Sequence, residues 1–386
     1  MPELFSSQAF AGFGPDPLNL CGGVPRLFCI QGRRPSSLRS QVRLDGPKRP
    51  GVYGMVDERG ELIYVGKARC LRSRLLSYFR PKSRDPKAGD IIARTRLLAW
   101  EVLPTELSAL LRELQLIRRW QPRFNVQGQP RRKRPAWVCL GRRPAPHVFL
   151  SPRVPSTAQA AFGPVPGGAR AREAVRRLND WFRLRDCPSP QTMTFADQQE
   201  LFPVIPSAGC LRLEIGTCLG PCAATCTHSD YLEQVRGARA FLEGKDVSAL
   251  ARIDRDMQAA ATAMQFERAA ALRDRLATLG WLHEHLERLR QARTLSLVYP
   301  LQGHDGRDRW YVIVRGDVRA VLAAPSSAAE ARAVAGVLEP IASGRTSAAE
   351  QVDNVLLIAA WFRKRPEELR KGMSLGQALE VCAKHR

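Results

Sequence analysis

The chain has 386 residues, 44% of them apolar, and a formal net charge of +23 from 60 basic and 37 acidic side chains. The apolar content excludes a wholly disordered chain, and the length allows about two to four domains. Apolar runs stay below the roughly 18 residues of a membrane-spanning helix, and residues 1–50 lack the layout of a signal peptide. The positive charge favours a polyanionic partner such as nucleic acid, although an arginine-rich composition alone would also produce it.

The first part of the chain, residues 1–46, is rich in Pro, Gly and Arg and shows no regular apolar period. Such a segment cannot bury enough apolar surface to fold alone, so we expect a mostly disordered basic arm. Its positive charge would allow weak contact with DNA.

The next part, residues 47–128, combines three predicted strands with two predicted helices. The first two strands contain Gly51-Val52-Tyr53 and Tyr64-Val65-Gly66, joined by a polar turn, and the third covers residues 97–103. On the basic helix that follows, Arg74 and Tyr78 are four residues apart and share one face. A later apolar-periodic helix carries one carboxylate, Glu113, which suits a hard divalent cation beside a phosphate. Cations and phenols that converge at a sheet edge suit a phosphodiester, whereas each charge taken alone would fit a solvated helix face.

These motifs resemble the GIY-YIG nuclease domain in the version found in UvrC/Cho-type excision-repair endonucleases. Under this resemblance the catalytic residues are Tyr53, Tyr64, Lys67, Arg74, Tyr78 and Asn125, and Glu113 is the ligand of Mg²⁺ or Mn²⁺. Either Tyr53 or Tyr64 would orient or deprotonate the attacking water, helped by Lys67 or the metal. Arg74 would stabilise charge in the transition state. Tyr78 and Asn125 would position the scissile phosphate.

Residues 129–230 are expected to form a linker and a cysteine-cluster domain. The linker begins with a run of four basic residues that is either a solvated loop or a phosphate-contacting one. With one residue of the basic helix, this run gives the candidate DNA-binding residues: Arg72, Arg131, Arg132, Lys133 and Arg134.

Four cysteines in this part are separated by 22, 7 and 3 residues: Cys187, Cys210, Cys218 and Cys222. Four thiolates can hold a zinc ion or an iron–sulfur cluster, and the alternative is that these are buried free cysteines. The spacing is similar to the four-cysteine arrangement of UvrC, which implies a [4Fe–4S] cluster more than Zn²⁺. Cys226 could replace one ligand.

Residues 231–289 show a helical pattern with a break near Met264-Gln265. The sequence after the break resembles the UVR motif, a helical hairpin that docks UvrB. This resemblance implies partner contacts by Phe266, Glu267, Ala270, Arg273 and Asp274. The alternative is an ordinary helical pair whose apolar stripe is internal core.

The sequence of residues 290–386 predicts three strands and then helices, which would form a small α/β domain of unknown role without a second acidic triad. The expected fold class is therefore mixed α/β with several domains. We expect the chain to lack the RNase H-like nuclease and the helix-hairpin-helix repeats of UvrC.

The resemblance implies a metal-dependent endonuclease of nucleotide excision repair. It would make one incision, on the 3′ side of a lesion, in damaged double-stranded DNA delivered by UvrB. The alternative is a catalytically idle DNA- or UvrB-binding module. We expect a cytoplasmic, nucleoid-associated monomer.

Overall fold

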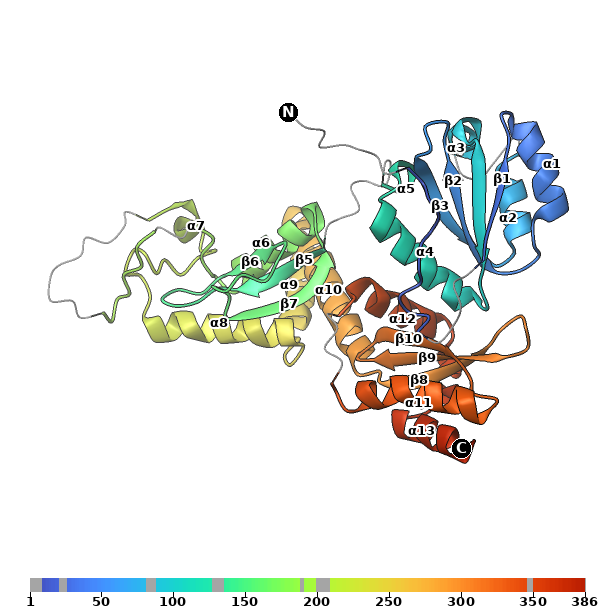
Figure 1. Ribbon diagram of the computed structural model, residues 1–386. Coiled ribbons are helices and arrows are strands. Elements are labelled where there is room, and N and C mark those ends of the chain that lie inside the picture. The colour runs from blue at the N-terminus through green and yellow to red at the C-terminus, as the bar shows by residue number, and fades with distance from the viewer. Residues whose placement is uncertain are drawn as a thin grey trace, which may run out of the picture. The chain divides into compact units, whose positions relative to one another are not determined.

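The computed structural model describes residues 9–20, 26–80, 88–126, 135–187, 191–198, 209–345 and 350–385. The chain divides into two compact units, one formed by Met1–Arg132 with Gln291–Arg386 and the other by Lys133–Arg290 (Figure 1). The predicted mixed α/β multidomain fold class is confirmed. Among the described residues, no helix is both long and apolar enough to cross a bilayer.

The first unit contains a four-stranded antiparallel sheet in the order β1-β4-β2-β3, which we call the N-terminal sheet. Its strands are β1 (Leu27–Gln31), β2 (Gly51–Val56), β3 (Leu62–Ala68) and β4 (Leu97–Val102). One face is covered by α1 (Pro35–Asp45), α2 (Leu71–Ser77) and α3 (Ala88–Arg94), and the other by α4 (Glu106–Trp120). The short helix α5 (Arg123–Val126) follows. This order places β3 at an edge, where its backbone is open to other groups.

Residues 1–46 were expected to form a mostly disordered arm, and this is wrong for much of the segment. β1 pairs with β4 over its whole length, and α1 buries Leu38 and Val42 against the sheet. Phe13 is 1% exposed, and its ring lies so close to Gly54 that a Cβ there would collide with it. A five-residue edge strand and a helix with two core residues give too weak an apolar period to be recognised in sequence.

The C-terminal part of the first unit is a three-stranded antiparallel sheet in the order β10-β9-β8, which we call the C-terminal sheet. Its strands are β8 (Leu297–Gln302), β9 (Asp308–Val314) and β10 (Asp317–Ala323). The helices α11 (Ala328–Ala342) and α13 (Leu375–Lys384) cover one face, and α12 (Val352–Lys364) lies on the other with α4. A 3₁₀ helix spans Pro366–Lys371. The predicted separate domain over 290–386 therefore shares a core with the N-terminal part of its unit.

The second unit packs a small sheet and its helices around one core. The sheet order is β6-β5-β7, from β5 (Pro135–Leu140), β6 (Val148–Ser151) and β7 (Ala160–Pro166). The helices are α6 (Ala169–Trp181), α7 (Leu211–Glu214), α8 (His228–Glu243), α9 (Ser248–Thr262) and α10 (Phe266–Arg293). The expected boundary between residues 230 and 231 is wrong, because Tyr231 and Leu282 join the same core as Val138. The helix break is where it was predicted, at Met264, whose φ is 56°.

Candidate active site

Three tyrosines and one arginine form a cluster between β2, β3 and α2, in which Tyr53 and Tyr78 are buried, Tyr64 is half-buried and Arg74 is exposed. The hydroxyls of Tyr53 and Tyr78 lie 2.8 Å apart, and Arg74 donates to both, from Nε to Tyr53 at 3.1 Å and from Nη2 to Tyr78 at 3.2 Å. The Tyr64 ring lies 6.2 Å from the Tyr53 ring and 6.1 Å from the Tyr78 ring. The structure thus brings together four of the predicted catalytic residues.

Burial separates the roles that these tyrosines can play. Tyr53 is 0% exposed and Tyr78 is 3% exposed, and burial raises the pKa of both phenols. Both therefore stay protonated at neutral pH, when they can donate a hydrogen bond but cannot accept a proton from water. Tyr64 is half-buried, so it is the tyrosine of this cluster that solvent reaches most easily.

The surroundings of Gly66 explain why the second motif ends in glycine. It lies directly opposite Tyr53 in the antiparallel pair, and a Cβ on it would collide with the Tyr53 hydroxyl. Any larger residue would push that phenol away from Arg74 and Tyr78.

Two more predicted residues attach to the backbone of β3. The carboxylate Oε1 of Glu113 accepts a hydrogen bond from the backbone N–H of Lys67 at 3.1 Å. Both amide atoms of Asn125 bond Val65, with Oδ1 accepting from its N–H at 2.7 Å and Nδ2 donating to its carbonyl at 2.8 Å. These two bonds fix α5 against β3. The expected role of Asn125 in positioning the scissile phosphate stays a prediction.

The candidate DNA-binding residues divide in two. Arg72 turns its guanidinium toward the end of α1, where it donates to the carbonyls of Gly46 and Leu44. This places it in a structural role between α1 and α2. The basic run Arg131, Arg132, Lys133 and Arg134 lies outside the described residues, so its contact with DNA stays a prediction.

One feature of the site gives no sequence signal. Arg112, next to Glu113 in α4, is 2% exposed and forms a buried ion pair with Glu101 of β4 at 3.0 Å. Arg112 also donates to the carbonyls of Gly14 and Pro15, which ties the N-terminal segment to the helix. An arginine in a helix is usually solvated, so its burial here could not be read from the sequence.

The four predicted cysteines line one pocket of about 110 Å³ in the second unit. The thiol of Cys187 receives a hydrogen bond from Arg185 Nη1 at 3.4 Å, and that of Cys218 from the backbone of Gly220 at 3.4 Å. Among the described residues, no three His, Cys, Asp or Glu side chains meet closely enough to hold one metal ion. Cys226 is buried away from the pocket lining, and burial raises its pKa to about 11.

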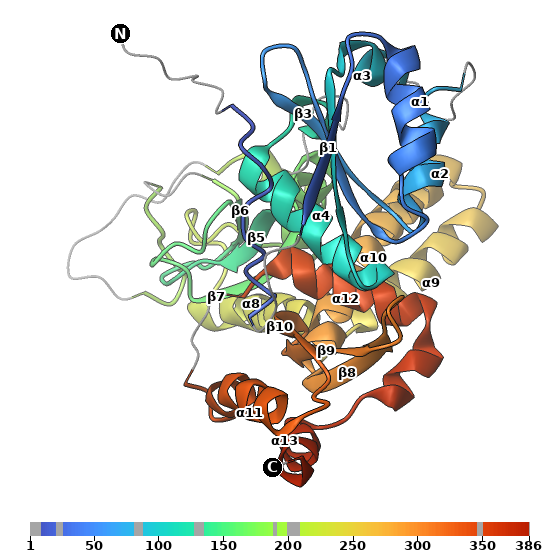
Figure 2. The ribbon, with the colours of Figure 1, turned by 45° about the vertical axis from the view of Figure 1, so that its right-hand side comes forward.

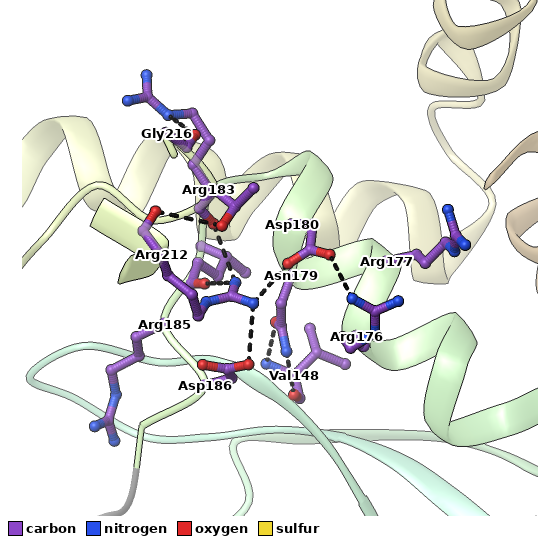
Figure 3. A network of polar contacts seen from close by, with 12 residues as sticks. Val148, Arg176, Arg177, Asn179, Asp180, Arg183, Arg185, Asp186, Arg212 and Gly216 are labelled. Atoms are coloured by element: carbon purple, nitrogen blue, oxygen red, sulfur yellow. Dashed lines mark hydrogen bonds and ion pairs between the residues drawn. The ribbon is translucent and has the colours of Figure 1, made fainter. Parts of the chain in front are cut away.

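A network centred on Arg212 holds this cysteine loop (Figure 3). Its Nη1 contacts Asp180 of α6 at 2.6 Å and Asp186 at 3.0 Å, and Nη2 donates to the carbonyls of Leu184 and Thr217. Because these contacts join both sides of the pocket, they fix Cys187 relative to Cys218.

The predicted partner-binding residues lie at the tip and outer side of the α9–α10 hairpin. Phe266 is 69% exposed and Met264 is 77% exposed. Arg273 and Asp274 are also exposed and pair with each other at 3.0 Å. An apolar tip without cover is an unusual feature of a soluble surface.

Comparison with protein families assigns most of these parts. Residues 49–126 match the UvrC-like GIY-YIG domain, residues 136–241 the middle domain of UvrC/Cho excinucleases, and residues 248–280 the UvrB/uvrC motif. The chain is a UvrC-like protein.

Relatives of this UvrC-like chain include the UvrABC system protein C of Desulforudis audaxviator, which is 36% identical over 230 residues. That alignment covers 60% of this chain and 35% of the relative. The corresponding protein of Chelativorans sp. is 34% identical over 239 residues, which are 62% of this chain and 35% of the relative. The chain thus spans about a third of the length of the curated relatives it matches.

Among solved structures, the chain is similar to the GIY-YIG N-terminal endonuclease domain of UvrC from Thermotoga maritima bound to its catalytic divalent cation, magnesium. The sequence identity is 35%, and the match covers 23% of this chain and 96% of that domain with a TM-score of 0.21.

Proposed function

We propose that this chain is a DNA endonuclease of nucleotide excision repair that makes one metal-dependent cut in damaged duplex DNA, on the 3′ side of the lesion. The observation that carries this proposal is the arrangement around β3. Tyr64 and Lys67 are on this strand, Tyr53 lies opposite Gly66, and Glu113 bonds the strand's backbone. A carboxylate, a cation and phenols beside one edge strand suit hydrolysis of a phosphodiester.

The donor chemistry near Glu113 fits a divalent cation with one protein ligand. Its carboxylate is half-buried and is held by the N–H of Lys67, so it is already oriented. A hard cation such as Mg²⁺ accepts one carboxylate and completes its shell with water and phosphate oxygens. When bound, the metal would polarise the phosphate and stabilise the leaving oxygen.

The other residues of the site would act on charge and on the proton. Arg74 is held by two phenols, so its guanidinium is preorganised to stabilise the negative charge that develops on the phosphate. Tyr64, which solvent reaches, would orient or deprotonate the attacking water. Tyr53 and Tyr78 would hold Arg74 in place.

The hairpin tip would bind the protein partner. Its exposed apolar residues and the neighbouring Glu267, Arg273 and Asp274 offer the apolar centre and polar rim of a small docking surface. By likeness to the UvrB/uvrC motif, the partner would be UvrB, which would deliver the damaged DNA.

The test is incision of a lesion-bearing duplex in Mg²⁺, with and without UvrB. We expect a single nick that requires UvrB and is reduced at least ~5-fold in Phe266→Ser, because a central apolar contact is worth more than about 1 kcal/mol. The matched control is Val247→Ser, which changes another exposed apolar residue, outside the hairpin tip. Any background nicking of naked DNA without UvrB should be the same in all three proteins.

Two results of this assay would contradict the proposal. If nicking depends on UvrB equally in the wild type and in Phe266→Ser, the hairpin tip does not bind UvrB and has a purely structural role. No cutting under any condition would favour an idle DNA- or UvrB-binding module.

We also propose that Cys187, Cys210, Cys218 and Cys222 hold a [4Fe–4S] cluster, with Zn²⁺ as the alternative. All four surround one pocket, yet no three meet around a single point. In a four-iron cluster each thiolate binds a different iron, so the sulfurs lie farther apart than around one zinc ion.

Metal analysis of protein purified without oxygen tests this assignment. We expect about four irons per chain, with loss of the iron in Cys218→Ser and its retention in Cys226→Ser. Bound zinc in place of iron, or no metal at all, would contradict it.

A further inference from the structure

Helix α4, which carries Glu113, is buried on two opposite sides by different parts of the first unit. Ala109 and Leu116 belong to the core of the N-terminal sheet, whereas Leu107 and Leu111 belong to the core of the C-terminal sheet. At 3.6 residues per turn these two pairs lie on opposite sides of the helix, and Glu113 lies on the side of Ala109. In Figure 2, α4 runs between the N-terminal sheet and α12. The C-terminal sheet is thus part of the surroundings of the metal-ligand helix.

The N-terminal end of α4 is tied to the C-terminal sheet by buried polar contacts. The hydroxyl of Tyr311, on β9, lies 2.5 Å from Thr105 Oγ1 and 2.6 Å from Ser108 Oγ. Thr105 is the N-cap of α4, and its side chain also accepts from the N–H of Ser108. All three side chains are buried, so each hydroxyl depends on the others for its hydrogen bonds. A shift of α4 along its axis would break this set.

The C-terminal end of α4 has its own tie. Arg118 contacts Asp353 of α12 at 3.0 Å and donates to Gln351 at 2.7 Å. These groups are partly exposed, so the pair adds less stability than the Tyr311 set. Its effect is to fix the rotation of the helix, because Arg118 lies on the same side as Leu107 and Leu111.

We propose that residues 291–386 act as a clamp that positions Glu113, with Tyr311 as the main positioning residue. Glu113 lies five residues from Ser108 and five from Arg118, so each tie is about 7.5 Å away along the helix axis. A misplacement of about 1 Å at a reacting group can reduce a rate about 100-fold, so holding both ends of the helix has a functional consequence. The proposal rests on the proposed nuclease function. It also gives a role to a part of the chain beyond the family matches, which end at residue 280.

The first test is the Mg²⁺ dependence of nicking by Tyr311→Phe, which removes the hydroxyl and keeps the ring. We expect the half-saturating Mg²⁺ concentration to rise about 2- to 10-fold, the effect of losing one net hydrogen bond. Excess Mg²⁺ should restore the rate, and the affinity for DNA should not change. The matched control, Glu330→Gln, breaks an ion pair with Arg307 on the α11 side of the same sheet and should leave the Mg²⁺ dependence unchanged.

The second test is hydrogen exchange of the full chain, which does not depend on activity. The amides of α4 should exchange faster in Tyr311→Phe, and faster still in the double variant with Asp353→Asn, while those of β8 to β10 keep their protection. Asp353→Asn alone changes a surface residue and gives a result even if Tyr311→Phe fails to fold. Unchanged α4 exchange together with unchanged Mg²⁺ dependence in the double variant would overturn the clamp. Absence of nicking in the wild type would instead overturn the proposed function, and the exchange comparison would still decide on the clamp.

Discussion

Glu113→Gln is expected to reduce DNA nicking by at least ~10³-fold while leaving DNA binding intact. The amide keeps an oxygen that can accept the hydrogen bond from the N–H of Lys67, so α4 and β3 should stay in register. It removes the negative charge that a divalent cation requires, and the metal supplies several kcal/mol of charge stabilisation in this kind of reaction. Single-turnover nicking in Mg²⁺, with binding followed by fluorescence anisotropy, measures the two effects separately.

The chain offers a matched control on the same helix. Glu106 of α4 pairs with Arg69 at 2.8 Å and with Arg365 at 3.1 Å, so Glu106→Gln also removes one carboxylate from α4. Its nicking rate should stay within about 3-fold of wild type, because ion pairs that are partly exposed to solvent contribute little. A Glu113→Gln variant that still cuts at a tenth of the wild-type rate would show that the metal is held elsewhere.

Arg74→Ala gives a useful contrast in the same assay. Removing one electrostatic stabiliser costs about 10²- to 10³-fold, so some nicking should remain where Glu113→Gln leaves essentially none. A rate near that of wild type would rule out the role given to Arg74.

The sequence was sufficient for the elements whose signal is local. The strands β2 and β3 and the helix α4 follow from short-range periodicity, and the three strands after residue 295 follow for the same reason. The site residues on them were found because each lies at a fixed place in a motif. The packing of residues 27–45 was missed, because β1 depends on pairing with β4, which is about 70 residues later in the chain.

Residues that act across long separations gave no such signal. The partners of Tyr311 are 203 and 206 residues away, and nothing around it marks its hydroxyl as buried. Arg112 looked like any charged helix residue, although it pairs inside the core with Glu101. The role of Asn125 was predicted from the motif alone. Only the structure shows that both atoms of its amide bond the backbone of Val65.

The choice between the two motif tyrosines leads to the second large effect. Tyr64→Phe is expected to lower the nicking rate about 10²- to 10⁴-fold, the range for losing a group that transfers a proton. Tyr53→Phe should lower it only about 10-fold, through the lost hydrogen bonds to Arg74 and Tyr78. The reason is burial, since Tyr53 is 0% exposed and water cannot reach its oxygen.

The pH dependence of the rate tests the buried phenol separately. Burial raises the pKa of Tyr53 above the ordinary pKa of a tyrosine, so this group keeps its proton near neutral pH and cannot shape the profile there. The pH profile of Tyr53→Phe should therefore keep the wild-type shape at a lower rate. If the profile of Tyr53→Phe changes shape near neutral pH instead, then the buried phenol must become exposed when DNA binds. The cluster around Arg74 would in that case have to open before each cut.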